Sequence, residues 1–115
     1  MAIALAEACI SGCLGAEINL GLTTTQIKDQ SRRWDEVLFG EGGARILVSV
    51  SPEHQVLWES YLKQHLGNDW QKIGRVGNTD TPLLVFTADN QPLIEVKLEQ
   101  MSDRYFNAIK RRLIL

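Results

Sequence analysis

Apolar residues near the start of the chain recur with the spacing of an amphipathic helix. Ile3, Ala6 and Ile10 are three or four positions apart, which places them on one face and predicts a helix over residues 2–14. The many alanines of this stretch also favour a helix. Gly15 follows at the position where a glycine commonly ends a helix, so we expect it to be the C-cap.

The rest of the chain alternates between short apolar runs and stretches with helical spacing. Ser51 and Pro52 form a typical helix start, because a hydroxyl group can cap the first turn and proline fits the first helical position. Residues 89–92, Asp-Asn-Gln-Pro, are typical of a hairpin turn. We expect strands over 16–20, 45–50, 70–76, 83–87 and 93–96, helices over 32–39, 52–65 and 99–113, and a loop or weak helix over 21–31. This order predicts an α+β fold, with a mixed four- to five-stranded sheet packed with helices.

Two of these helices carry apolar residues at helical spacing. In the helix that starts at Pro52, we expect Val56, Leu57 and Tyr61, with Leu62 beside them, to face inward. In the last helix, apolar residues repeat every four positions at Met101, Tyr105, Ile109 and Leu113.

The composition is that of an ordinary globular domain. The 115 residues suffice for a single domain over 1–115, and 44% hydrophobic with 23% charged residues is close to the globular average. A net charge of −2 provides no basic surface for nucleic acid. No apolar run is long enough to span a membrane. We therefore expect a cytoplasmic chain with neither a nucleic-acid nor a membrane partner.

Residues that carry catalytic or metal chemistry are few and scattered. Cys9 and Cys13 lie one turn apart on a predicted helix, which suits a disulfide poorly, so we expect free thiols. His54 and His65 are about three turns apart on another helix, too far to share a metal ion. No Ser–His–Asp set or paired carboxylates are evident. We expect no catalytic residue and no metal site in the chain itself.

A glycine-rich turn is the one candidate for ligand binding. Gly40, Glu41, Gly42 and Gly43 precede a predicted strand that begins at Arg45. Glycines leave backbone N–H groups accessible to an anion, and the arginine could add a bidentate contact to a phosphate. The alternative is a tight helix-to-strand turn in which Arg45 pairs with an acid such as Glu17 or Glu95, and Glu41 bonds to backbone amides.

Four segments of the chain resemble one enzyme family in the correct order. They are residues 4–18, ALAEACISGCLGAEI; residues 38–41, LFGE, with 45–50, RILVSV; residues 73–77, IGRVG; and the closing helix over 99–109. Together they resemble the synthetase subunit of phosphoribosylformylglycinamidine synthase. Because Met1 precedes a helix without a capping residue, we expect the natural chain to continue upstream.

The resemblance implies a part of a larger ligase of purine biosynthesis. The family makes formylglycinamidine ribonucleotide from formylglycinamide ribonucleotide, ATP and ammonia released from glutamine, and it needs magnesium. The chain is similar to the carboxy-terminal domain of the second of two pairs of domains, each pair resembling aminoimidazole ribonucleotide synthetase. Implied partners are the remaining domains and the glutaminase component. A homodimer is a separate expectation, because the alanine-rich helix over 2–14 and the three tryptophans supply more apolar surface than one small core needs. The ATP and magnesium belong to the parent enzyme, and we expect none on this domain alone.

The turn departs from the family pattern. The family often has Glu-Ser after "FG", where this chain has Glu41, Gly42 and Gly43. Without the serine hydroxyl, only backbone amides and Arg45 remain to contact a substrate. We therefore expect the chain to contribute structure and a domain interface, and to be inactive alone. The alternative is a free-standing, non-catalytic module that binds a small ligand or a protein.

Overall fold

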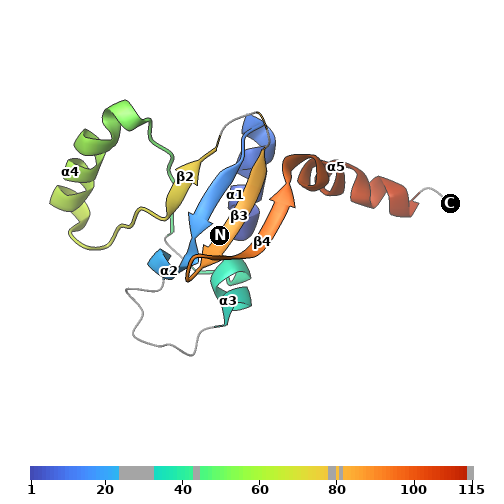
Figure 1. The fold of residues 1–115 in the computed structure, drawn as a ribbon, viewed down its shortest axis with the longest axis horizontal. Coiled ribbons are helices and arrows are strands. Elements are labelled where there is room, and N and C mark those ends of the chain that lie inside the picture. Colours follow the sequence, from blue (N-terminus) through green and yellow to red (C-terminus); the bar gives the residue numbers. More distant parts are fainter. Residues whose placement is uncertain (24–32, 43–44, 78–79, 81, 114–115) are drawn as a thin grey trace.

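The computed structural model describes residues 1–23, 33–42, 45–77, 80 and 82–113. These residues form a four-stranded sheet in the order β2-β1-β3-β4, in which β1 is parallel to β3 and the other pairs are antiparallel (Figure 1). The mixed sheet and its helices confirm the predicted α+β class. The strands are β1 (Ala16–Asn19), β2 (Gly74–Val76), β3 (Leu83–Ala88) and β4 (Gln91–Lys97).

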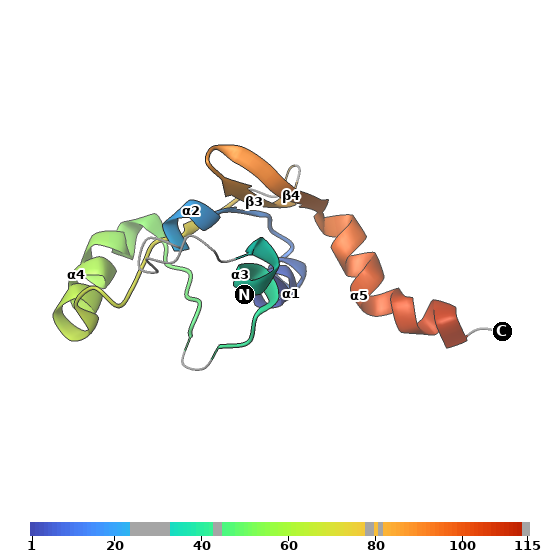
Figure 2. The same ribbon diagram turned by 90° about the horizontal axis from the view of Figure 1, so that it is seen from below.

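Helices cover one face of the sheet. Figure 2 shows α1 and α3 beside each other below the sheet, whereas α4 and α5 extend to opposite sides. The helices are α1 (Ala2–Gly12), α2 (Leu20–Thr23), α3 (Trp34–Phe39), α4 (Gln55–Leu66) and α5 (Leu98–Leu113), and a 3₁₀ turn, η1 (Pro52–His54), precedes α4.

The core lies between the sheet and the helices below it. Side chains of β3 alternate, and its buried positions are Leu84, Phe86 and Ala88. Strand β1 adds Ile18, and Leu20 at the start of α2 is completely buried. This period of two is what a strand with one covered face requires.

Helix α1 ends earlier than the sequence predicted. Its C-cap is Cys13, which adopts a left-handed conformation with φ 54°, and not Gly15. Gly15 has another role, because a Cβ at this position would overlap the backbone of Leu83. A glycine here lets the chain pass close to β3. The inner face agrees with the prediction in part: Ala6 and Ile10 pack against the core, whereas Ile3 is exposed and the buried residues are Ala2 and Cys9.

One predicted strand is absent, and another is shorter than predicted. Residues 45–50 have no strand partner among the described residues, and of the segment 70–76 only Gly74–Val76 pairs, with β1. Strand formation depends on a partner at hydrogen-bonding distance as well as on composition. The loop predicted over 21–31 begins with the end of α2, and 24–32 lie outside the described residues.

Helix α4 forms where predicted but does not face the core. Val56, Leu57 and Tyr61 expose 75%, 72% and 53% of their surface, so their predicted inward orientation is wrong. The start of this helical segment also differs from the prediction. The Ser51 hydroxyl bonds to Nδ1 of His54 at 2.8 Å and does not cap a backbone amide. Pro52 occupies the first position of η1, as expected for a helix start.

The hairpin between β3 and β4 is confirmed, although its turn is shorter than predicted: it consists of two left-handed residues, Asp89 and Asn90, and β4 already begins at Gln91. Asp89 has φ 52° and Asn90 has φ 61°, the positive φ values that a type I′ turn requires.

We expect Asn90→Ala to lower the free energy of unfolding by about 1 kcal/mol, because alanine tolerates this left-handed conformation less well. The matched variant Asn90→Gly should cost nothing. Urea denaturation of both variants measures the difference, and equal losses would contradict this role of the backbone.

Polar side chains of α5 form hydrogen bonds with one another along the surface of the helix. Oδ1 of Asp103 accepts hydrogen bonds from Nη2 of Arg111 at 2.5 Å and from Nδ2 of Asn107 at 3.0 Å. The Arg111 bond, then the Asn107 bond, hold the pKa of Asp103 below its usual value. Because the pKa of Asp103 is lowered in the folded chain, its ionised carboxylate contributes to folding stability at neutral pH. This contribution to stability is lost as the pH falls through that lowered pKa.

We therefore expect Arg111→Gln to raise the pKa of Asp103 toward its ordinary value, because the largest cause of the shift is removed. Titration of the Asp103 carboxyl by NMR measures this. Lys110→Gln is the control, since the Asp103 carboxylate is bonded to Asn107 and Arg111 and, within the described part of α5, not to that lysine. An unchanged Asp103 pKa in Arg111→Gln would contradict the assignment.

Candidate functional site

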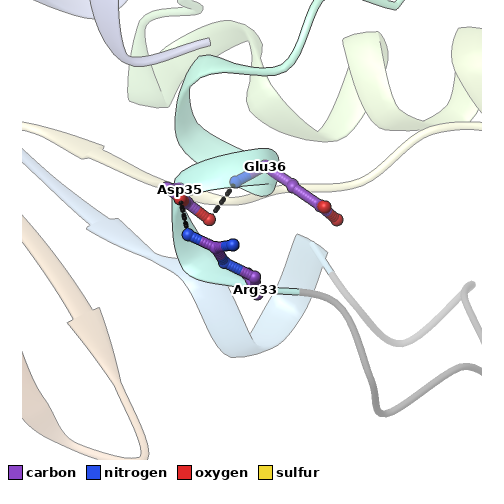
Figure 3. A network of polar contacts seen from close by, with 3 residues as sticks. All are labelled: Arg33, Asp35 and Glu36. Carbon is purple, nitrogen blue, oxygen red and sulfur yellow. Dashed lines mark hydrogen bonds and ion pairs between the residues drawn. The ribbon is translucent and has the colours of Figure 1, made fainter.

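The glycine-rich turn is held at one end by α3. Val37 and Leu38 of this helix are buried in the core. At the start of the helix, Nη2 of Arg33 lies 2.6 Å from Oδ2 of Asp35, whose Oδ1 accepts a hydrogen bond from the backbone N–H of Glu36 at 2.9 Å (Figure 3). The ion pair is exposed and contributes little to stability. Burial of the two apolar side chains therefore positions the turn.

Gly40 is the residue at which α3 ends, and its backbone amide is hydrogen-bonded to the helix. Its N–H donates to the carbonyl oxygen of Glu36 at 2.8 Å. A Cβ at this position would overlap the same carbonyl, so a glycine is needed for the backbone to leave the helix here. Since this N–H is occupied, it is not available to an anion.

Gly42 and Arg45 are brought together by the turn. A Cβ on Gly42 would overlap the guanidinium of Arg45, so the arginine side chain folds back over the glycine backbone. No ion pair of Arg45 is present among the described residues, and neither Glu17 nor Glu95 contacts it in this way. Glu41 is exposed, and Gly43 lies outside the described residues.

The two cysteines and the two histidines do not come together in a catalytic or metal-binding site. Cys9 is buried and Cys13 exposed, and both are free thiols, as predicted. Burial raises the pKa of the Cys9 thiol, so it carries little reactive thiolate at neutral pH. Both histidines are exposed. Within the described part of the chain, His, Cys, Asp and Glu nowhere gather in a group of three that could hold a metal ion, and no helix is long and apolar enough to cross a membrane.

Two shallow hollows were not predicted, because residues distant in sequence form them. One, of about 200 Å³, lies along β1 and β2, and the other, of about 280 Å³, lies between α1 and α5. Neither includes a residue of the turn. The first is lined by Glu17, Asn19, Lys72, Ile73, Gly74 and Arg75, and the second by Glu7, Ile10, Ser11, Cys13, Ser102, Tyr105 and Phe106.

Known proteins resemble the chain closely over its whole length. It is 63% identical over 115 residues to "Phosphoribosylformylglycinamidine synthase subunit PurL" of Nostoc sp. and 60% identical over 115 residues to the protein of that name from Trichormus variabilis. It is 43% identical over 113 residues to the Synechococcus elongatus protein of the same name. All of the chain is covered by the first two matches and 98% by the third.

These relatives are much longer than the chain, which spans 14% of the length of each of them. No family model and no solved structure matches the chain. The identity to the relatives is too high and too continuous to reflect a shared fold alone. The chain is therefore a homologue of one segment of the phosphoribosylformylglycinamidine synthase subunit, which confirms the resemblance found in its sequence.

Proposed function

We propose that the chain is the carboxy-terminal domain of an ATP-dependent formylglycinamidine ribonucleotide synthetase, and that it contributes structure and a domain interface. The observation that carries this proposal is the 63% identity along all 115 residues to a segment of the Nostoc subunit. As a carbon–nitrogen ligase of purine biosynthesis, the whole subunit would work in the cytoplasm with a glutaminase component, either singly or as a homodimer.

The catalytic groups are proposed to lie elsewhere in the subunit. Among the described residues, the Ser51 hydroxyl does lie 2.8 Å from Nδ1 of His54, but both residues are exposed and lie outside the two hollows, and no three metal-ligating side chains form a cluster. Magnesium is held in proteins by carboxylates together with substrate phosphates. Because the described residues offer no such arrangement, we assign ATP and magnesium to other domains and expect the isolated chain to be inactive.

A segment exchange tests this function. The matching 115 residues of the Nostoc subunit are replaced by this chain, and formation of the amidine product from the ribonucleotide, ATP and glutamine is measured. We expect kcat/KM of this chimera to stay within about tenfold of the parent, since less than about 1.4 kcal/mol should be lost at an interface built from homologous residues. A correctly folded but inactive chimera would overturn the proposal.

We also propose that the turn keeps a weak contact for a phosphate through Gly42 and Arg45. Charge-assisted hydrogen bonds contribute about 1.5–3 kcal/mol each, so one or two give millimolar affinity at best. We expect inorganic phosphate at about 10 mM to shift the amide resonance of Gly42 but not that of Gly40, whose N–H is bonded within α3. NMR titration measures both resonances.

The same titration decides between this contact and a purely structural turn. Arg45→Ala should abolish the Gly42 shift, and Arg75→Ala, which removes an exposed arginine of β2, should leave it unchanged. A shift that survives Arg45→Ala, or no shift at all, would leave the turn with its structural role. Binding of ATP and of the ribonucleotide is compared in the same way.

A further inference from the structure

Residues 45–50 have the composition of a buried strand but are exposed. Ile46, Leu47 and Val48 expose 87%, 44% and 58% of their surface. Successive residues of a strand point to opposite faces, so apolar side chains at three consecutive positions are typical of a strand covered on both faces. The backbone of this segment also lacks a ladder partner among the described strands.

Helix α4, which follows this segment after the 3₁₀ turn η1, is equally uncovered. The structure describes α4 in full and none of its residues is buried. Its rings form a row along one side, with the ring centroids of Trp58 and Tyr61 5.8 Å apart and those of Tyr61 and His65 4.3 Å apart. Figure 1 shows the helix standing away from the sheet. Tryptophan and tyrosine are enriched at protein–protein interfaces.

Exposed apolar side chains gather on this part of the described chain. Ile46, Val48, Val56, Leu57 and Tyr61 each expose more than half of their surface, at 87%, 58%, 75%, 72% and 53%. Large exposed apolar patches usually mark a protein contact. In the Nostoc relative the matching segment is only 14% of the polypeptide, so a much larger protein surface belongs to the same molecule and can cover this one.

We propose that residues 45–66 form an assembly surface for the rest of the synthase polypeptide, with 46–50 entering a sheet of that polypeptide as a β-strand. Pairing would satisfy the backbone N–H and C=O groups of the segment and bury Ile46 and Val48 together. The exposed face of α4, at Val56, Leu57 and Tyr61, packs on the same sheet. This inference rests on the proposed function, which supplies the larger polypeptide.

Hydrogen exchange tests the assembly surface, and activity of the chimera tests the function separately. We expect the amides of 46–50 to exchange about 100-fold more slowly in the chimera than in the isolated chain. The amides of β3 are the control, because they are already paired and should be protected in both. An active chimera with fast exchange over 46–50 would overturn the inference while leaving the function intact.

Two other outcomes would also overturn it. Protection of 46–50 in the monomeric isolated chain would mean that the segment pairs with its own sheet. Protection that rises with concentration, together with dimerisation, would mean that a second copy covers the surface.

A proline variant adds a second measurement. Val48→Pro removes a backbone donor, so we expect it to abolish protection of 46–50 in the chimera and to lower the yield of folded protein. In the isolated chain, where Val48 is unpaired, the urea midpoint should not change. Retained protection in the proline variant of the chimera would contradict strand pairing.

Discussion

Phe86→Ala is expected to lower the free energy of unfolding by about 3–5 kcal/mol, the cost of deleting a large aromatic side chain from a packed core. Phe86 exposes 2% of its surface and lies in the centre of β3, between β1 and β4. Its removal leaves a cavity that neighbouring side chains can fill only in part. A loss of this size is a large fraction of the stability of a small domain. Urea denaturation measures it.

Phe106→Ala is the matched control, because it makes the same chemical change on the outside of α5. Phe106 exposes 66% of its surface and contacts Tyr105 edge-on, with ring centroids 5.0 Å apart. We expect this variant to cost less than about 1 kcal/mol. Similar losses for the two phenylalanines would contradict the assignment of the core to the face of the sheet that α1 and α3 cover.

Gly15→Ala is expected to cost about 3 kcal/mol although it adds only one methyl group. The new Cβ would overlap the carbonyl oxygen and the nitrogen of Leu83. Backbone atoms cannot move aside as a flexible side chain can, so β1 and β3 would have to separate where they begin to pair. The carbonyl of Gly15 also accepts a hydrogen bond from Gly77 at 2.7 Å, which this separation would strain.

Gly12→Ala provides the opposite control. A Cβ at Gly12, in the last turn of α1, meets no atom closer than Cδ1 of Leu14 at 4.0 Å. Alanine is the better helix former, so this variant should be neutral or gain about 0.5 kcal/mol. Comparing the two glycine variants by urea denaturation separates the effect of close strand packing from a general effect of replacing glycine. A Gly15→Ala variant as stable as Gly12→Ala would show that the strands accommodate the methyl group.

Part of the candidate site could be predicted from the sequence. The glycines after Phe39 indicated a turn, and Gly40 does end α3 there. That its amide is occupied, and that Arg45 folds over Gly42, follow from backbone geometry that residue types do not encode. The two hollows were also beyond prediction, because each combines residues from segments that only the fold brings together.

By itself, the sequence determined the elements whose stability is local, and the relationship to the synthase subunit. The turn at Asp89 and Asn90, the alternation of β3 and the helical spacing of α5 each depend on neighbours a few residues away. Only the tertiary structure decided which apolar faces are covered. Residues 45–50 and α4 have the composition of buried elements, but burial needs a partner surface, and the other residues that the structure describes do not provide it. Pairing and burial are long-range properties, so a local pattern can indicate that an element needs a partner without indicating which one.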